Sequence, residues 1–149
     1  MAEKPCKDCV AEGVTTKRPA PYPGPRCKTH DLAVRRARRT KAHGNRVLSV
    51  YGITPEQYAE IYEAQGGVCF ICRRATGATR KLSVDHDHLI ADQECGHDPK
   101  TGCPECVRGL LCRPCNDMLG HARDDGEVFL RAILYLANPP AKGILHEEP

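Results

Sequence analysis

The chain has little with which to build a large apolar core. Its 149 residues contain no tryptophan and only 5% aromatic residues, and the mean hydropathy is −0.50. A chain this polar buries limited apolar surface, so cross-links or metal ions are expected to stabilise it. No apolar stretch is long enough to cross a bilayer, which predicts that the protein has no membrane partner. No apolar run follows Met1 either, so no secretory signal is expected and a cytoplasmic location is predicted.

Ten cysteines are the obvious source of that stabilisation. They fall in close pairs, and close pairs suit tetrahedral zinc better than a web of disulfides. A reducing cytoplasm also disfavours disulfides, which remain the alternative. We therefore expect between one and three structural Zn²⁺ ions.

Three sets of ligands follow from the spacing. Two C-x-x-C pairs at Cys69/Cys72 and Cys112/Cys115 predict a closed, structural site that joins distant stretches of chain. The other two sets are Cys6, Cys9, Cys27 and His30, and Cys95, His97, Cys103 and Cys106. For the first of these the alternative is free thiols in a flexible tail, and for the second a zinc-free pair with a stray cysteine. Exchange of ligands between Cys103/Cys106 and Cys112/Cys115 is also open.

Charge is unevenly distributed along the chain. The net charge is +3, but residues 1–50 carry +8 and residues 51–149 carry −5. A basic segment beside an acidic, ligand-rich remainder indicates a nucleic-acid contact next to a cation site, although a solvated tail is the alternative. The cations expected to contact DNA are Arg35, Arg36, Arg38, Arg39, Lys41, Arg46 and, beside a zinc pair, Arg108.

Local patterns predict the elements. A helix is expected from Leu32 to about Val50, capped by Asp31 and interrupted near Gly44, and a second should begin after the capping box at Thr54 and stop at Gly66-Gly67. A short strand is expected over 81–84, an irregular loop over 91–107, and a helix from Asn116 that breaks near Gly120. A last amphipathic helix over about 126–137 should turn one face inward, and a flexible tail should follow Pro139. That inward face comprises Val128, Phe129, Ala132, Ile133 and Leu136.

The run Asp85-His86-Asp87-His88 is the candidate for chemistry, because four adjacent titratable residues would be costly to bury unpaired. Together with Val107-Arg108-Gly109-Leu110-Leu111 and the Cys112-x-x-Cys115-Asn116 segment, it resembles the recombination endonuclease VII family of phage HNH nucleases. The segments Tyr51–Tyr58 and Gly66–Cys72 resemble the helix and zinc pair at the start of that family's domain. The resemblance covers about residues 51–137.

The resemblance implies a metal-dependent DNA endonuclease. It implies that Asp85 and Asn116 hold a catalytic Mg²⁺ or Mn²⁺, that His86 is the general base, and that His88 contacts the scissile phosphate. A carboxylate and an amide oxygen suit a hard cation, and imidazole suits a base at neutral pH. Such a protein would act in the cytoplasm of a phage-infected cell, with other DNA-processing or packaging proteins as conceivable partners.

The expected fold is a small α+β fold with a zinc-stapled ββα-metal (HNH, or His-Me finger) core, flanking helices and an N-terminal zinc-binding segment. Its expected parts are residues 1–50, 51–138 and a tail at 139–149. Ser83 replaces a histidine of some relatives, so a role for that histidine does not carry over. The long C-terminal extension of the best-known members is missing, which leaves their dimer architecture and branched-DNA preference unsupported; the oligomeric state, a dimer included, stays open. The alternatives are a non-catalytic zinc module that binds nucleic acid and a zinc-stapled protein-interaction domain.

Overall fold

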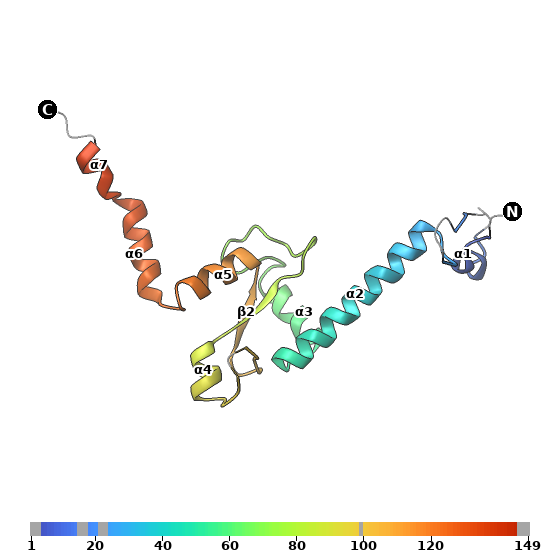
Figure 1. The fold of residues 1–149 in the computed structure, drawn as a ribbon, viewed down its shortest axis with the longest axis horizontal. Helices are drawn as coiled ribbons and strands as arrows, with labels where there is room; N and C mark the ends of the chain where they lie inside the picture. The colour runs from blue at the N-terminus through green and yellow to red at the C-terminus, as the bar shows by residue number, and fades with distance from the viewer. Residues whose placement is uncertain (1–3, 15–17, 21–23, 99, 146–149) are drawn as a thin grey trace. The chain divides into compact units, whose positions relative to one another are not determined.

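The computed structural model describes residues 4–14, 18–20, 24–98 and 100–145, which form a small α+β fold. The elements are α1 (Lys7–Ala11), α2 (Lys28–Tyr51), α3 (Pro55–Ala64), β1 (Ser83–His86), α4 (His88–Gln93), β2 (Val107–Leu111), α5 (Arg113–His121), α6 (Gly126–Ala137) and α7 (Pro140–Leu145) (Figure 1). They divide between two compact units, residues 1–55 and 56–149. Among the described helices, none is both long and apolar enough to traverse a bilayer.

The long helix of the first unit, α2, begins earlier than expected. Cys27 is its N-cap, so Asp31 lies inside the first turn and pairs with Arg35 at 2.7 Å instead of capping the helix. The helix also continues through Gly44, and the predicted interruption there is wrong. A Cβ at Gly44 would lie 2.8 Å from Cγ of Pro55, so glycine permits close packing at this point. Gly52, with φ of 66°, ends the helix in the left-handed conformation.

The second unit contains all of α3 except its first residue, and that helix begins as its sequence predicts. Helix α3 begins at Pro55, the residue after Thr54, and proline is well suited to the first helical position because it has no N–H to leave unpaired. Gly66 and Gly67 follow the helix with φ of 76° and 72°, which side chains rarely adopt. The predicted stop is therefore confirmed.

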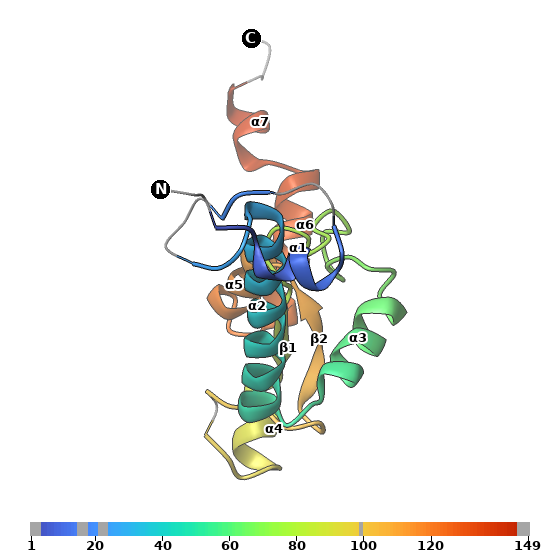
Figure 2. The ribbon, with the colours of Figure 1, turned by 90° about the vertical axis from the view of Figure 1, so that its right-hand side faces the viewer.

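The sheet of this unit consists of β1 and β2, paired antiparallel (Figure 2). Strand β1 begins two residues later than expected, so Asp85 and His86 lie within it. Asp85 is opposite Gly109, and the register is irregular between Asp85 and His86, where the strand ends. Val84, Leu110 and Leu111 are buried. The two residues expected to carry chemistry are thus fixed by a strand.

A side chain completes the outer edge of β2. The buried Gln65 accepts a hydrogen bond from the Leu110 N–H at 2.7 Å and donates to the Leu110 carbonyl at 2.8 Å and to the Val68 carbonyl at 3.1 Å. This amide pairs with β2 much as a third strand would. A Cβ at Gly109 would lie 2.9 Å from the Gln65 Oε1, which explains why glycine stands opposite Asp85.

Two helices differ from expectation around the Asp-His run. Residues 88–93 form α4, so the first three residues of the loop expected over 91–107 are helical instead. The helix forms here because the Asp87 carboxylate accepts hydrogen bonds from the N–H groups of Leu89 and Ile90 at 2.9 and 3.1 Å. Helix α5 begins at Arg113, three residues before the predicted start, and ends at His121, one residue after Gly120, so the predicted break near Gly120 is confirmed. The chain turns after it, where Arg123 and Asp124 have φ of 54° and 56°.

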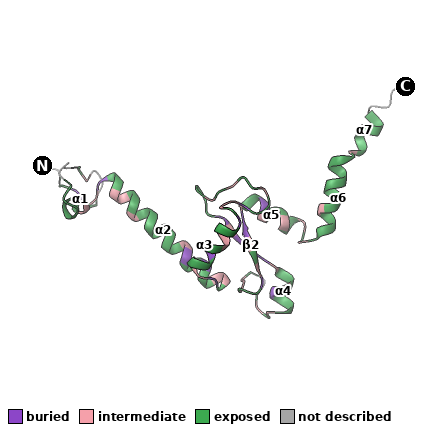
Figure 3. Ribbon diagram, turned by 180° about the vertical axis from the view of Figure 1, so that it is seen from behind, coloured by how far each residue is buried: buried purple, intermediate pink, exposed green. Residues whose placement is uncertain are grey.

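Helix α6 has the predicted bounds but not the predicted burial. None of its residues is buried, and Ile133 and Leu136 are 62% and 76% exposed (Figure 3). The expectation that one face packs inward is wrong, because amphipathic spacing predicts an apolar face but not an element to cover it. Residues 140–145, expected within a flexible tail, form α7, and the last four residues of that tail lie outside the described residues.

Candidate metal centres and active site

Among the described residues, three four-ligand clusters form, and they are the three sets predicted from spacing. In each, one ligand atom per residue lies within 4.8 Å of all the others. All ten cysteines are free thiols, so the disulfide alternative is not realised in the structure. Cys103 and Cys106 gather with Cys95 and His97, and no exchange with the Cys112/Cys115 pair occurs. These clusters could bind zinc.

The spacing of the sulfur atoms fits a tetrahedral ion. Zinc lies about 2.3 Å from a thiolate, so two sulfurs of one tetrahedron should be about 3.8 Å apart. The Sγ–Sγ distance is 3.8 Å for Cys72 and Cys112, for Cys9 and Cys27, and for Cys103 and Cys106. A disulfide would bring the sulfurs to about 2.05 Å. The Cys95 and Cys103 sulfurs are closer, at 3.3 Å. The donor types suit zinc in all three clusters, and the 3.8 Å spacings have the size of a tetrahedral site.

The cluster of Cys69, Cys72, Cys112 and Cys115, here called the core cluster, joins the loop after α3 to the start of α5. Cys69 and Cys115 are buried, and Cys112 is the N-cap of α5. The backbone N–H of Cys69 donates to the Ala75 carbonyl at 2.8 Å, so the cluster also fixes the course of the loop. Because Cys112 directly follows Leu111 of β2, an ion here would tie the sheet to α5.

The N-terminal cluster includes an oriented histidine. The Nδ1 atom of His30 lies 3.3 to 3.4 Å from the sulfurs of Cys6, Cys9 and Cys27. Its other ring nitrogen, Nε2, lies 3.0 Å from a carboxylate oxygen of Glu12. A ligating histidine commonly has its second nitrogen bonded to a carboxylate, which fixes the ring. Glu12 was not predicted and has this supporting position.

The third cluster is linked to the Asp-His run. The Cys106 carbonyl accepts a hydrogen bond from the Asp87 N–H at 2.8 Å, and the His97 N–H donates to the Ala91 carbonyl of α4 at 3.1 Å. Cys106 is buried and lies directly before β2. The cluster therefore braces both ends of α4 and the strand that faces β1.

Thiol pKa values diverge within the clusters. Hydrogen bonds from the backbone N–H groups of Arg74 and Ala75 lower the pKa of Cys72 to about 6. Burial, together with the neighbouring thiols, raises the pKa of Cys115 to about 12 and that of Cys9 to about 12. Crowded thiolates repel one another, so without a cation only some of these thiols can ionise at neutral pH. A divalent ion would remove that repulsion and allow all of them to bind as thiolates.

Asp85, near the end of β1, is a buried carboxylate whose orientation is fixed by Arg108. Asp85 accepts two hydrogen bonds from Arg108, from Nε at 2.8 Å and from a terminal nitrogen at 3.1 Å. Arg108 also donates to Asp124 at 2.9 Å and lies 3.7 Å from Asp87. Hydrogen bonds and charge from Asp85 and Asp124 raise the pKa of Arg108, against the opposing effect of burial. A carboxylate has about four lone-pair positions, so Asp85 keeps some free for another ligand.

Two histidines adjoin this carboxylate. His86 is buried, whereas His88 is exposed, and their rings meet edge to face with centroids 4.7 Å apart. The Nδ1 atom of His88 lies 3.5 Å from the Asp124 carboxylate. Asp124 thus contacts both Arg108 and His88, a position that no sequence pattern revealed because it lies in a turn between two helices.

Among the described residues, Asn116 carries the one buried side-chain nitrogen or oxygen atom without a hydrogen-bond partner. Its Oδ1 is buried and has no hydrogen-bond partner. It lies in the first turn of α5, where its N–H donates to the Cys112 carbonyl at 3.0 Å, and α5 packs against β1, which carries Asp85. An orphaned buried amide oxygen is costly and calls for a ligand such as a cation. The residues present therefore fit a hard divalent ion.

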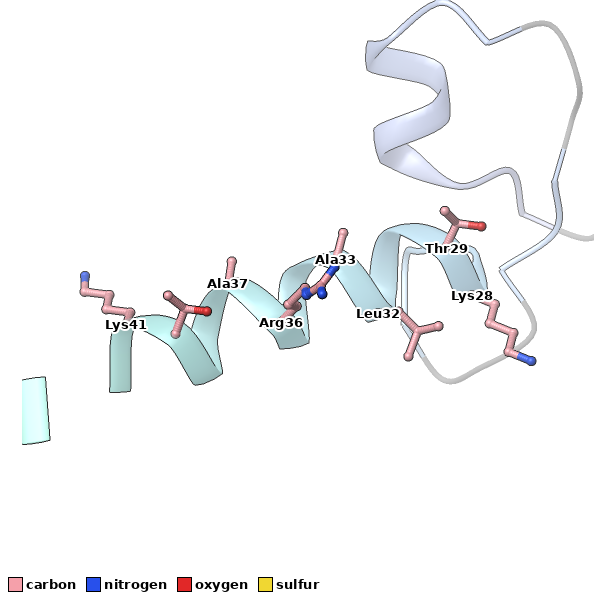
Figure 4. A pocket seen from close by; sticks show the side chains of 8 residues that line it. Lys28, Thr29, Leu32, Ala33, Arg36, Ala37 and Lys41 are labelled. Atoms are coloured by element: carbon pink, nitrogen blue, oxygen red, sulfur yellow. The ribbon is translucent and has the colours of Figure 1, made fainter. Parts of the chain in front are cut away.

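The predicted DNA-contacting cations fall into two groups. The six from Arg35 to Arg46 are all exposed on α2, and an open groove along this helix is lined partly by Arg36 and Lys41 (Figure 4). The groove has no acid, thiol or imidazole, so it offers charge but no catalytic chemistry. Arg108, by contrast, is committed to carboxylates.

Comparisons with known proteins give a family and two phage relatives. Residues 44–138 match the family model described as recombination endonuclease VII. The chain is 52% identical over 145 residues to the "Gene 59 protein" of Mycobacterium phage L5, which covers 97% of this chain and 80% of that protein. Identity to the "Gene 59 protein" of Mycobacterium phage D29 is 51%, over 97% of this chain and 79% of that protein. No solved structure matches the chain.

Proposed function

Because the chain belongs to the recombination endonuclease VII family, a family of DNA-processing nucleases, we propose that it hydrolyses DNA as an HNH-type endonuclease with one catalytic cation. The observation that carries this proposal is the orphaned Oδ1 of Asn116. It lies on the helix that packs against the strand bearing Asp85 and His86. Under this proposal β1, β2 and α5 are the ββα-metal core, within a catalytic domain at residues 51–138.

Asp85 and Asn116 would hold the cation, Mg²⁺ or Mn²⁺. Two oxygen ligands from the protein leave positions for water and phosphate, as Mg²⁺ sites commonly do. Such an ion, when bound, neutralises charge on the scissile phosphate and on the leaving oxygen. Arg108 supports this role, because its two hydrogen bonds fix the orientation of the Asp85 carboxylate.

His86 would be the general base. It accepts a proton from the attacking water, and an imidazole in a buried position next to the reacting phosphate is suited to this at neutral pH. His88 is exposed and would donate a hydrogen bond to the phosphate. Asp124, 3.5 Å from His88, would hold the ring in place.

The remaining parts of the chain would bind DNA and stabilise the fold. Residues 1–50 would grip DNA through the exposed cations of α2, which give sequence-independent affinity for phosphates. Zinc in the three clusters would be structural, because closed four-ligand sites have no open position for substrate. Thiolates prefer zinc and oxygen ligands prefer Mg²⁺, so the two metals would not exchange sites.

Cleavage assays test the proposal directly. The full chain, loaded with zinc, is incubated with supercoiled plasmid, linear duplex or a four-way junction, each with Mg²⁺ or Mn²⁺. We expect cleavage that His86→Ala and Asn116→Ala reduce by about 100-fold or more, while His121→Ala, which removes an exposed histidine of α5, retains it. Wild-type rates in His86→Ala would refute the assigned base. Salt-sensitive DNA binding without cleavage in any divalent metal would instead establish a non-catalytic zinc module.

A further inference from the structure

A basic hollow lies beside the catalytic strand. It is about 530 Å³ in volume and lies between the loop at 74–82 and the first turn of α5. Four cations line it, Arg74, Arg80, Lys81 and Arg113, and no acidic residue does. Among the described residues, Arg74, Arg80 and Lys81 form no ion pair, and Arg113 has only the exposed Asp117, at 3.2 Å. A concave surface with four such charges favours an anion.

The loop that carries these cations is fixed at several points. The Tyr62 hydroxyl donates to the Thr76 carbonyl at 2.7 Å, and the Tyr58 hydroxyl donates to the Leu82 carbonyl at 2.9 Å. Leu82 is buried, and Ala75 is bonded to Cys69 of the core cluster. Anchored backbone on both sides lowers the conformational entropy lost when the loop binds a ligand.

The neighbouring Arg73, unlike the cations that line the hollow, interacts with other residues of the fold. Arg73 donates to the Gln65 carbonyl at 3.0 Å, and its guanidinium lies 4.7 Å from the centroid of the Phe70 ring. Arg73 thus has partners within the fold, whereas Arg74, Arg80 and Lys81 point their charges at no described acid. The fold accounts for the first cation and leaves the other three for a ligand.

We propose that this hollow binds the phosphodiester backbone of DNA next to the cleavage site, a subsite that rests on the proposed endonuclease function. Leu82, in its lining, is three residues before Asp85, a separation of about 10 Å along a strand. Phosphates of one DNA strand recur roughly every 3.4 Å along the helix axis. The hollow therefore engages phosphates roughly two or three nucleotides from the scissile one. Thr76 and Thr79, also in the lining, add hydroxyl groups for phosphate oxygens.

The test measures DNA affinity against salt in the His86→Ala background, so that binding is read without cleavage. The cavity triple Arg74→Gln/Arg80→Gln/Lys81→Gln is compared with the control triple Lys100→Gln/Arg131→Gln/Lys142→Gln, which removes the same charge outside the lining. The logarithm of the DNA association constant falls linearly with the logarithm of salt concentration. Each lost phosphate contact should make this negative slope shallower by about 0.9. We expect the slope to become shallower by about 2 to 3 in the cavity triple and by less than about 1 in the control triple.

Three outcomes decide the matter. A shallower salt dependence of DNA affinity in the cavity triple alone, with zinc content unchanged, supports the subsite. Equal slopes in the two triples overturn it, because general electrostatics would then explain the binding. The endonuclease proposal is tested separately by wild-type cleavage. If the wild-type chain cuts DNA and the triples behave alike, the subsite alone fails, whereas a chain that neither binds nor cuts DNA defeats both.

Discussion

Replacing Gln65 with methionine should severely weaken the sheet that carries the proposed catalytic residues. Methionine matches glutamine in length and removes all three side-chain hydrogen bonds, to Val68 and to both backbone groups of Leu110. The Leu110 carbonyl keeps a longer bond, from the Phe70 N–H at 3.3 Å, but the Leu110 N–H loses its partner. That N–H belongs to a fully buried residue.

The size of the effect follows from these contacts. A lost hydrogen bond costs about 1 kcal/mol, and an orphaned buried N–H costs roughly 1–3 kcal/mol. We expect Gln65→Met to lower the free energy of unfolding by about 3–5 kcal/mol, a large part of the roughly 5–15 kcal/mol typical of a domain. Methionine offsets little of this, because its thioether is a weak acceptor and cannot donate.

Denaturant unfolding of the zinc-loaded protein, followed by far-ultraviolet circular dichroism, measures the change. The matched control is Gln93→Met at the exposed end of α4, which should change the free energy of unfolding by less than about 0.5 kcal/mol. Hydrogen exchange gives a local measure, since the Leu110 amide should lose protection. A loss below about 1 kcal/mol, with that amide still protected, would refute the assigned role of Gln65.

Three further predictions concern the site. Asn116→Leu removes an orphaned buried oxygen, so it should leave the free energy of unfolding unchanged or higher while cleavage falls about 100-fold in kinetic assays; equal losses of stability and activity would contradict this. Asp124→Asn should lower kcat about 10-fold with zinc content intact, because Arg108 and His88 lose a partner, whereas Glu127→Gln should not. Cys95→Ser should lower the zinc count by one in elemental analysis and expose the Asp87 amide to exchange, leaving the Leu110 amide protected; an unchanged zinc count would exclude Cys95 as a ligand.

Much of the ligand chemistry could be predicted because it is local in sequence. A C-x-x-C pair brings two sulfurs to one ion whatever surrounds it, and the three predicted clusters are the ones that gather. Helix bounds set by proline or paired glycines were also predictable, at Pro55 and at Gly66-Gly67. Gly44 shows the limit of that reasoning. The sequence alone does not distinguish a glycine that permits close packing against Pro55 from a glycine that ends a helix.

Contacts between distant residues could not be predicted. Gln65 bonds Leu110 across 45 positions, and Arg108 bonds Asp85 across 23 and Asp124 across 16. No spacing rule connects such pairs, because they depend on the fold that they stabilise. The apolar spacing of α6 was seen, but its burial could not be inferred, since periodicity describes one helix and burial requires a second element.

The balance of charge at the site predicts that metal and DNA bind cooperatively. Three carboxylates, Asp85, Asp87 and Asp124, surround Arg108 within 3.7 Å, which leaves a formal charge of −2. A DNA phosphate brought next to them would be repelled unless a divalent cation compensated that charge. We therefore expect Ca²⁺, added at constant ionic strength, to raise the DNA affinity of His86→Ala, measured by fluorescence anisotropy. The Asn116→Leu change in the same background should remove the effect, because it deletes a proposed ligand. Ca²⁺ dependence that persists in the double variant would mean that the ion acts on DNA elsewhere.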